Sequence, residues 1–563
     1  MFTLFLITFA SFAEIISIGA IIPFLGILTA PDIVFAHNAT QPIINMFGWT
    51  EAGQLLFPLT LAFGISAIVA GVMRLFTLWA ITRLSYAAGA DLSLSIYRRT
   101  LYQPYEVHTR RNSSEVIAGI VAKANNAISG VIMPVLTIIN SFVVISFIII
   151  ALLAAEPRIA LIIFGTFGSI YLLIILFTRR QLLKDSQSIA HESIQVIKSL
   201  QEGLGGIRDV LISASQDVYC NIYRKSDLAL RRSQGNNTFI AQSPRYLMEA
   251  FGMLLISIVA FILVQYSDGT AHVIPMLGAL ALGAQRLLPI LQQAYSGWSS
   301  IKAGQISLQD TLDLLDQPLP DLESQPLRKL LTFNEKITFN QISFRYNLET
   351  PWILEKLSLD IVKGSCVGFI GETGSGKTTL LDITMGLLYP TEGSFAVDGQ
   401  IITMANNRAW QKHIAHVPQD IFLADSSIAE NIAFGVVKDQ IDPERVRDAA
   451  RKAQIASIID TWAKGYETVV GERGVRLSGG QRQRIGIARA LYKRADVIIF
   501  DEATSALDTE TEQAVMQAIE SLSEDLTVII IAHRITTLKN CSQIVELGDG
   551  VIKRISTYKE IIS

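Results

Sequence analysis

The sequence predicts an α-helical membrane domain followed by an α/β domain, with a short linker between them. Half of the 563 residues are hydrophobic and only 17% are charged, which is lean for a soluble protein. The apolar excess lies before about residue 300, and a glycine-rich loop that fits a phosphate-binding pattern lies after it. We therefore expect residues 1–316 to form the membrane domain, residues 317–336 the linker and residues 337–563 the α/β domain.

Six apolar stretches in the first part are each long enough to span a bilayer, which takes about 20 residues. They cover residues 2–28, 55–81, 128–154, 159–177, 247–266 and 271–295. The first stretch has no basic segment ahead of it and is longer than the apolar core of a cleaved signal peptide. We therefore interpret it as a retained span.

The placement of lysine and arginine sets the expected orientation of the spans. Residues 29–54, between the first two spans, contain neither residue type, whereas residues 82–127 and 178–245 are rich in both. These two long segments are therefore expected in the cytoplasm, and the short turns after the third and fifth spans outside. Six crossings return the chain to the cytoplasm, so the α/β domain that follows is expected there.

Both long cytoplasmic segments are compatible with helices, so we expect the spans to continue through them. Each is interrupted near its middle, by Tyr-Gln-Pro-Tyr at residues 102–105 and by Gly-Leu-Gly-Gly at residues 203–206. Short crossing segments at these breaks could contact the α/β domain. Ordinary helical hairpin turns explain the same residues equally well.

Charge and cysteine content limit the possible partners and cofactors. The formal net charge is −3 and no basic tract is present, so nucleic acid is not an expected partner. Three cysteines, Cys220, Cys366 and Cys541, lie far apart in the sequence, which supports neither a disulfide framework nor a metal site. We expect all three to be buried, reduced thiols.

The phosphate loop is Gly371-Glu372-Thr373-Gly374-Ser375-Gly376-Lys377-Thr378, which fits G-x-x-x-x-G-K-[ST]. Residues 366–370 before it are typical of a buried strand, and residues 379–388, from Thr379 onward, are typical of a helix. Such a loop turns N–H groups towards an anion at a helix N-terminus. Lys377 is expected to reach the β- and γ-phosphates of ATP, and Thr378 to offer its hydroxyl to Mg²⁺. A chance match is the alternative, and the strand and helix around the loop argue against it.

A second apolar run, residues 497–500, ends in the carboxylates of Asp501 and Glu502. Buried parallel strands have this composition, and α/β sheets bind ligands at the carboxyl ends of their strands. Asp501 is expected to hold Mg²⁺ through water, and Glu502 to orient and deprotonate the attacking water. A structural pair is the alternative, and the position downstream of the phosphate loop favours catalysis. Residues 337–346 and 357–361 are also typical of strands.

Leu477-Ser478-Gly479-Gly480-Gln481 matches the signature of ATP-binding cassette (ABC) proteins and lies shortly before that strand. With the phosphate loop, Gln419, Asp508 in Ser-Ala-Leu-Asp and His533, the set resembles a complete ABC ATPase, an α/β P-loop NTPase. The motifs cover nearly all of residues 337–563 in the order of the family. Six spans followed by one such domain resemble an ABC exporter half-transporter. The resemblance implies ATPase activity with ATP and Mg²⁺ as cofactors.

The resemblance also implies a role for each motif. Tyr346 resembles the aromatic residue that stacks on adenine. Gln419 resembles the residue that contacts Mg²⁺ and water, and His533 the histidine that bonds the γ-phosphate. Further nucleotide contacts are implied for Thr379, Asp508 and the signature residues, which bind the γ-phosphate from the opposing subunit: Ser478, Gly479, Gly480 and Gln481. Because the chain has one cassette, two copies are needed, and a homodimer is the simplest expectation. A heterodimer with a paralogous chain is the alternative.

Three arginines lie within or at the ends of spans: Arg74 in the second, Arg245 at the start of the fifth and Arg286 in the sixth. A charged residue inside a span costs about 2.5–3.5 kcal/mol on insertion scales, so it needs a partner or a cavity. Glu14 in the first span could neutralise Arg74, which leaves a structural ion pair and substrate binding both open. Guanidinium groups suit phosphate and pyrophosphate. Several of them around one cavity favour an anionic, lipid-linked substrate.

Residues 201–210, 243–249 and 286–289 resemble stretches of the flippases of lipid-linked oligosaccharides in bacterial protein N-glycosylation. The resemblance implies ATP-driven flipping across the bacterial inner membrane, with residues 30–54 as an external helix. A broad lipid or drug exporter is the alternative within transport. The alternative from another functional class is a nucleotide-gated channel or regulator, and the presence of Glu502 argues against it. The family usually begins with an amphipathic helix, whereas Met1 opens almost directly into the first span, which leaves open whether Met1 is the true start.

Overall fold

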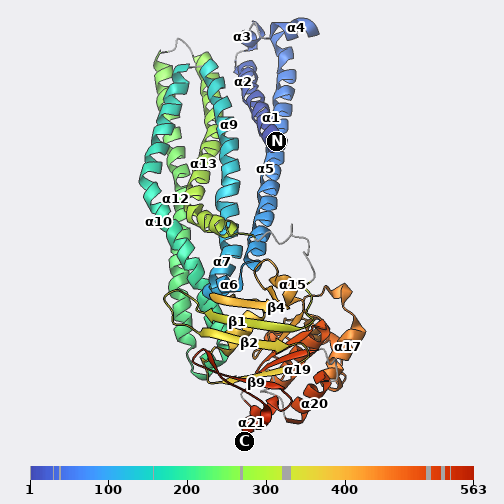
Figure 1. Cartoon of the computed structure of the whole chain (residues 1–563). Helices are drawn as coiled ribbons and strands as arrows, with labels where there is room; N and C mark the ends of the chain where they lie inside the picture. Colours follow the sequence, from blue (N-terminus) through green and yellow to red (C-terminus); the bar gives the residue numbers. More distant parts are fainter. Residues whose placement is uncertain are drawn as a thin grey trace. The chain divides into compact units, whose positions relative to one another are not determined.

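The computed structural model describes residues 2–29, 31–36, 40–155, 157–266, 270–319, 331–502, 509–520, 526–532 and 534–562. Contacts between residues divide the chain into two compact units (Figure 1). The N-terminal unit comprises Met1–Gln103 and Val107–Pro320, and the C-terminal unit comprises Pro104–Glu106 and Asp321–Ser563. Residues 320–330 of the predicted linker lie outside the described residues.

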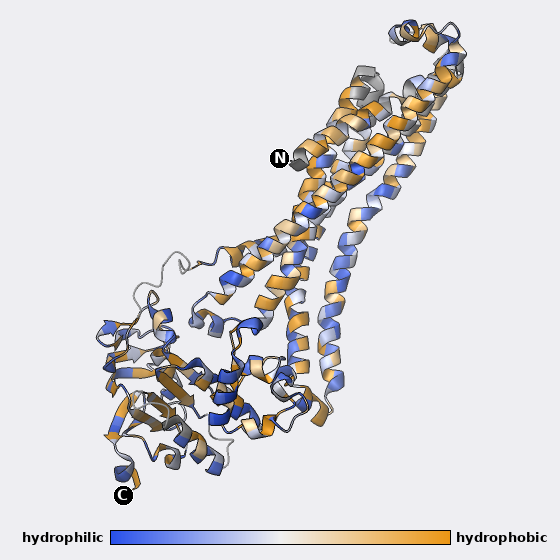
Figure 2. Cartoon of the chain, turned by 90° about the vertical axis from the view of Figure 1, so that its right-hand side faces the viewer, coloured by the Kyte–Doolittle hydropathy of each residue, from blue (hydrophilic) through white to orange (hydrophobic). Residues whose placement is uncertain are grey.

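The N-terminal unit places helices over all six predicted spans. These helices are α1 (Phe2–Gly19), α2 (Ile21–Thr29), α5 (Leu56–Leu101), α9 (Met133–Ala155), α10 (Pro157–Gly205), α12 (Gln216–Tyr266) and α13 (Thr270–Leu315). Figure 2 shows apolar residues towards one end of the long helices and more polar residues towards the other. Among the described residues, three helical segments are long and apolar enough to cross a membrane: Ala52–Leu101, Ser113–Ile150 and Phe164–Gly205.

The first span differs from the prediction of one helix over residues 2–28, because the helix breaks at Ala20. Proline has no N–H to donate, and its ring clashes with the carbonyl four residues earlier in a continuous helix. For Pro23 that carbonyl belongs to Gly19, the last residue of α1. A new helix starts at Ile21, so Pro23 falls in the first turn of α2, where no N–H is needed.

Short helices fill the segment between α2 and α5. They are α3 (Pro31–Ala36), α4 (Gln41–Phe47) and the 3-10 turn η1 (Ala52–Leu55). Ile27, Ile44 and Leu55 form a small buried cluster among them. A capping box between Glu51 and Gln54 fixes the start of η1. Residues 30–54 therefore contain the expected short helix, in several pieces.

The predicted helical continuations and both breaks are confirmed. Helices α5, α10 and α12 run for 46, 49 and 51 residues. After the breaks come α6 (Tyr105–Arg110) and α11 (Ile207–Ile212). From α6 to α9 the chain continues as α7 (Ser113–Ala118), η2 (Gly119–Lys123), α8 (Ala124–Ala127) and η3 (Ile128–Ile132), of which η2 and η3 are π-helical turns. At the first break, Pro104–Glu106 group with the C-terminal unit.

Two sheets form the C-terminal unit (Figure 1). The first is antiparallel in the order β2-β1-β4-β5, from β1 (Lys336–Phe344), β2 (Leu354–Val362), β4 (Glu392–Val397) and β5 (Gln400–Ile401). The second has the order β10-β9-β3-β8-β7-β6 and is parallel except for β10. Its strands are β3 (Cys366–Gly371), β6 (Ile414–Val417), β7 (Val497–Asp501), β8 (Thr527–Ile531), β9 (Gln543–Gly548) and β10 (Val551–Ser556). All four predicted strands are present, as β1, β2, β3 and β7.

Apolar residues pack on both faces of the second sheet, as expected for buried parallel strands. Along β7, Val497 and Ile499 belong to one buried cluster, and Ile498 and Phe500 belong to another. The helices and helical turns of this unit are α14 (Lys377–Thr384), α15 (Asn407–Gln411), α16 (Ile428–Ile432), η4 (Lys438–Gln440), α17 (Pro443–Lys452), α18 (Ala456–Ile459), η5 (Gly465–Glu467), η6 (Glu472–Gly474), α19 (Gly479–Lys493), α20 (Thr509–Glu520), η7 (Ile535–Leu538) and α21 (Tyr558–Ile562). The helix predicted over residues 379–388 ends early, because Gly386 takes a left-handed φ of +63°.

Candidate functional site

Three glycines shape the loop between β3 and α14. Gly371, Gly374 and Gly376 have φ angles of +147°, +87° and +96°, which residues with a side chain rarely adopt. A Cβ atom on Gly371 would lie 2.2 Å from the carbonyl oxygen of Leu547, and one on Gly376 would lie 2.9 Å from that of Ile353. A Cβ atom on Gly374 would meet nothing within 4 Å. The loop therefore depends on glycine and is open to a ligand at its middle.

Lys377 is the first residue of α14, and it is buried, with 8% of its surface exposed. Its ammonium group donates to the carbonyl oxygens of Gly371 and Glu372, each at 2.8 Å, and approaches the buried Ser375 hydroxyl at 3.5 Å. Carbonyl and hydroxyl oxygens are neutral acceptors, so an anionic phosphate oxygen would be a stronger partner. Thr378 follows in the first helical turn and is exposed, and Thr379 is buried. Helix geometry leaves the N–H groups of this turn without helical acceptors.

The parallel sheet brings the ends of β3 and β7 to one edge, with only β8 between them. Asp501 is the last residue of β7, and Glu502 follows it with a left-handed φ of +53°. Strained backbone of this kind gathers at functional sites. Gln419, which follows β6, donates its side-chain amide to Oε2 of Glu502 at 2.8 Å. Residues predicted from separate motifs therefore meet at the same edge of the sheet as the phosphate loop.

Two carboxyl groups near this edge are harder to ionise than usual. Burial, and then the neighbouring Glu502 carboxylate, raise the pKa of Asp501, while the Lys377 ammonium lowers it. Burial, and then the charge of Asp501, raise the pKa of Asp382 to about 6. Sequence reasoning missed Asp382. Its position four residues after Thr378, hence on the same face of α14, was the available signal.

Tyr346 lies just after β1 and is 36% exposed. Phe344 packs edge-on against its ring, with the centroids 5.1 Å apart. The partly exposed aromatic ring of Tyr346 suits stacking on a flat aromatic ligand.

The signature segment forms the N-terminus of α19. Ser478 is the N-cap, and its hydroxyl oxygen accepts from the N–H of Gln481 at 3.2 Å. The side chain of Gln481 accepts from the N–H of Ser478 at 2.8 Å, which completes a capping box. This arrangement leaves the hydroxyl hydrogen of Ser478 to donate. It also leaves Gly479 and Gly480 in the first turn, whose N–H groups have no helical acceptors. Asp508 and His533, which the resemblance also assigns to the site, lie outside the described residues.

The residues present fit a nucleotide with its metal ion. The open glycine loop and buried Lys377 suit phosphates, and Tyr346 suits a base. No group of three or more His, Cys, Asp or Glu side chains that could hold a metal ion occurs among the described residues. Magnesium usually takes one or two carboxylates together with substrate phosphates, so the oxygen atoms of Thr378, Gln419 and Asp501 suit an ion that arrives with the nucleotide.

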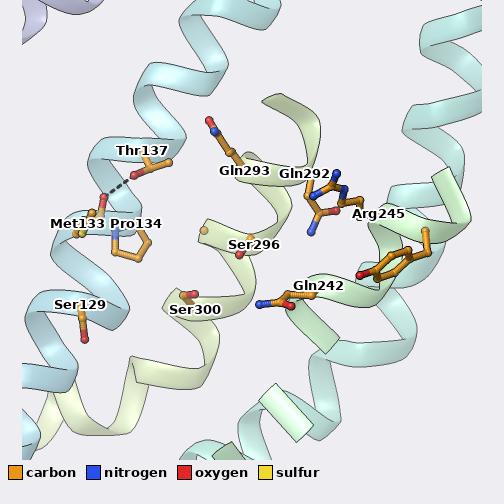
Figure 3. Close-up of a pocket in the computed structure, with 12 residues that line it drawn as sticks. Ser129, Met133, Pro134, Thr137, Gln242, Arg245, Gln292, Gln293, Ser296 and Ser300 are labelled. Carbon is orange, nitrogen blue, oxygen red and sulfur yellow. Dashed lines mark hydrogen bonds between the residues drawn. The ribbon is translucent and has the colours of Figure 1, made fainter. Parts of the chain in front are cut away.

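The predicted arginines have different surroundings. Arg74 donates Nε and Nη2 to the two carboxylate oxygens of Glu14, at 2.8 and 2.7 Å. The ion pair that the sequence left open is therefore present. Arg245 donates Nε to Glu249 at 2.8 Å, and it lines a pocket with α9 and α13 residues (Figure 3). The side chain of Arg286 lies outside the described residues.

All three cysteines are free thiols, as expected, but the expectation that all of them are buried is wrong. Cys220 is exposed. Cys366 opens β3, and Cys541 precedes β9, which pairs with β3, so the two residues lie side by side with their Sγ atoms 2.8 Å apart. Residues that are 175 positions apart in the sequence meet because the parallel sheet joins the ends of the domain.

Two family models match this chain. The model described as "ABC transporter transmembrane region" matches residues 1–278, and the model described as "ABC transporter" matches residues 354–505. The first match lies in the N-terminal unit and the second in the C-terminal unit.

Similar proteins were also found. An "ATP-dependent lipid A-core flippase" from Cupriavidus pinatubonensis is 26% identical over 549 residues, covering 96% of this chain and 92% of that protein. A protein of the same name from Desulfotalea psychrophila is 39% identical over 265 residues, 47% of this chain and 46% of its own length. The solved structure of a "bacterial Atm1-family ABC exporter with ATP bound" has a TM-score of 0.77 at 24% identity, covering 97% of this chain and 95% of that one. At this identity, the last comparison shows a similarity of fold alone.

Proposed function

This chain is an exporter-type half-transporter of the ABC transporter family, with an ATPase domain joined to a multi-pass membrane domain, and we propose that it flips a polar-headed lipid. The proposed location is the bacterial inner membrane, with the C-terminal unit in the cytoplasm. The lysine- and arginine-rich segments between the second and third spans and between the fourth and fifth support this orientation.

The observation that carries the proposal is the edge of the sheet at which β3 and β7 both end. It holds an open glycine loop, a buried lysine with neutral partners, and Glu502 in a hydrogen bond with Gln419. In the proposed mechanism Lys377 binds the phosphates, and Glu502 orients a water molecule and takes its proton. Gln419 positions Glu502 and links this edge to the segment after β6. Mg²⁺, when bound, would neutralise phosphate charge beside Thr378, Gln419 and Asp501.

The working unit in this proposal is a homodimer. Each chain has one phosphate loop and one signature segment, and the signature has the free donors of a helix start. Two such chains, arranged symmetrically, form two equivalent sites in which Ser478, Gly479 and Gly480 of one copy bind the γ-phosphate held by the other.

The proposed substrate has an anionic or hydroxylated headgroup on a hydrocarbon tail. Relatives over nearly the full length carry the name lipid A-core flippase, which supports lipid flipping as the common activity. Within this class we favour a lipid-linked oligosaccharide, because residues 201–210, 243–249 and 286–289 resemble the flippases of such lipids. The exposed guanidinium of Arg245 suits a phosphate group of such a headgroup.

A reconstituted flipping assay tests this function. The full chain is placed in vesicles with a fluorescent polyprenyl-pyrophosphate saccharide, and ATP-dependent loss of the label from one leaflet is measured. The expected result is ATP-driven translocation that Glu502→Gln stops. Stimulation of ATPase activity by hydrophobic amines but not by the saccharide lipid would identify a drug exporter. ATP-gated flux down a gradient that persists in Glu502→Gln would identify a channel.

A further inference from the structure

Cys366 and Cys541 form a pair of thiols inside the C-terminal unit, and the nucleotide site uses neither of them. Cys366 is the first residue of β3, and Cys541 lies two residues before β9. Their Sγ atoms are 2.8 Å apart. A disulfide bond is about 2.05 Å long, so the two sulfur atoms need only a small further approach to form one.

Ordered backbone holds both residues in this position. β3 and β9 pair in parallel, starting one residue after Cys366. Just before this pairing, Ser542 donates its N–H and its hydroxyl to the carbonyl oxygen of Cys366, each at 2.9 Å. The N–H of Cys541 donates to the carbonyl oxygen of Leu538 at 3.0 Å, which closes the turn ahead of β9. The two thiols therefore meet because hydrogen bonds fix the backbone on both sides of them.

The two thiols differ in their access to solvent, and this difference suits a two-step oxidation. Cys541 is 6% exposed, whereas Cys366 is partly exposed. Thiol–disulfide exchange begins when a thiolate attacks a disulfide and forms a mixed disulfide, which a second thiolate then resolves. Cys366 is placed for the first step, towards a small disulfide such as oxidised glutathione, and Cys541 for the second.

The atoms balance in this sequence. Sγ of Cys366 bonds to one sulfur of oxidised glutathione and releases the other half as a thiolate. Sγ of Cys541 then bonds to Sγ of Cys366 and releases the second half. The two protein thiols lose two hydrogens, and one oxidised glutathione becomes two reduced ones.

The resulting bond would close a long loop of the chain. The two cysteines are 175 positions apart, and the chain between them carries β4 to β8 and α14 to α20. Closing such a loop restricts the unfolded chain, and in the chain-entropy model the stabilisation grows with the length of the loop. Most of the C-terminal unit lies inside the loop, so the bond opposes the unfolding of the whole unit.

The same bond should leave the phosphate loop unchanged. Cys366 is at the start of β3, whereas Gly371 is at its other end, paired with Leu547 of β9. A bond at the starts of the two strands fixes the register that their far ends already have. ATP hydrolysis should therefore continue in the oxidised protein.

We propose that Cys366 and Cys541 are a reversible oxidation site, whose disulfide stabilises the C-terminal unit when the surrounding thiols become oxidised. Disulfides in cytosolic proteins are mostly transient and respond to the redox state of the compartment. Oxidation of this pair does not depend on which lipid is transported. It would keep the ATPase domain folded, and active, under oxidising conditions.

The full chain with Cys220→Ser, in lipid nanodiscs, is the protein for the test, because this change removes the exposed cysteine that could link separate copies. One sample is incubated with oxidised glutathione and the other with reduced glutathione. The intact mass distinguishes the loss of two hydrogens from the gain of a glutathione. Thermal unfolding, ATPase activity at room temperature and the temperature at which brief heating destroys half of that activity are then measured in both samples.

Oxidised glutathione should remove two hydrogens from the chain and raise both temperatures by about 5–10 °C, the usual gain from one disulfide in a domain of this size. ATPase activity at room temperature should be unchanged, and dithiothreitol should reverse the rise. Cys366→Ser and Cys541→Ser, in the same background, are the matched controls, because each keeps one thiol of the pair. Their unfolding temperatures should be the same in both forms of glutathione.

Each other outcome decides against part of the proposal. A stable mixed disulfide on Cys366 without loss of two hydrogens would show that the thiols do not join, and it overturns the site. A bond without a rise in temperature, or an equal rise in either serine variant, overturns the stabilising role. Loss of ATPase activity in step with bond formation would identify an inhibitory bond and overturns that role too. A chain that passes these tests but flips no lipid rejects the proposed function and keeps the oxidation site.

Discussion

Breaking the ion pair between Glu14 and Arg74 separates a structural role from a substrate role for this arginine. The pair joins α1 to α5 through two hydrogen bonds of 2.7 and 2.8 Å, and the carboxylate side chain is only 6% exposed. Arg74→Gln removes the two hydrogen bonds that the guanidinium donates to that buried carboxylate. Glu14→Gln/Arg74→Gln removes both charges and keeps two polar side chains of similar size. The two variants therefore differ mainly in the buried Glu14 charge, which only the single variant keeps.

The expected cost follows from the geometry. Removing one partner of a buried pair costs about 3–5 kcal/mol, whereas replacing both is close to neutral. The arginine side chain is 57% exposed in the isolated chain, so we expect the lower end, about 3 kcal/mol, for Arg74→Gln. At about 2–3 °C for each kcal/mol in a large domain, the single variant should unfold about 6–9 °C lower. The double variant should lie within about 2 °C of the unaltered protein.

Thermal unfolding in nanodiscs measures the stability, and lipid-stimulated ATPase activity measures the function. Arg83→Gln is the control, because Arg83 is exposed on the same helix. The structural reading predicts that the double variant recovers both stability and stimulation. Loss of stimulation in both variants at unchanged stability would refute it and assign Arg74 to the substrate.

Three further changes probe the C-terminal unit. Glu502→Gln should lower ATP hydrolysis by about 10²–10⁴-fold while ATP still binds, because the group that takes the proton of water is lost; normal hydrolysis would reject this role. A carboxyl whose pKa is raised by folding destabilises the fold above that pKa, and this cost fades as the pH falls through about 6 towards the usual value of 3.8. Asp382→Asn should therefore raise the unfolding temperature of the nucleotide-free protein at pH 7.5, with a difference that shrinks below pH 5, and a pH-independent difference would contradict this reason. Treatment with hydrogen peroxide should join Cys366 to Cys541, with two thiol hydrogens lost and peroxide reduced to water; continued alkylation of both thiols after treatment would show that they do not meet.

Local patterns predicted much of the fold because each has a direct physical cause. The glycine loop needs backbone angles that only glycine adopts readily, as at Gly371. Its pattern can therefore be recognised in a single sequence. The run from Val497 to Phe500 is apolar at every position because both faces of the sheet are covered. The long polar helices beyond the spans followed from the low proline content of these segments. The break at Ala20 was missed because Pro23 lies in a predominantly apolar stretch that is long enough for one span.

Contacts between distant segments were harder to predict. The proximity of Cys366 and Cys541 depends on strand order, which no local pattern encodes. Asp382 was missed because a single acidic residue on a helix does not indicate a functional site by itself. Its role depends on Asp501 at the end of β7, which lies near it in the fold. The bond from Gln419 to Glu502 could be expected only through the family resemblance. The pocket around Arg245 escaped prediction because three helices supply its polar residues at unrelated positions.

Mixing two inactive variants tests the central claim, that each ATP is bound by the loop of one copy and the signature of another. Lys377→Ala removes the phosphate cation. Gly480→Asp places a negative charge where the γ-phosphate would lie. The substitution should not destabilise α19, because an acidic residue in the first turn of a helix is favourable. In a mixed dimer one site carries both changes and the other carries neither. Random pairing makes half of the dimers mixed, and each mixed dimer has one intact site of its two. Coexpression should therefore restore about a quarter of normal ATPase activity. No recovery beyond either variant alone, in dimers shown to be mixed, would contradict the claim.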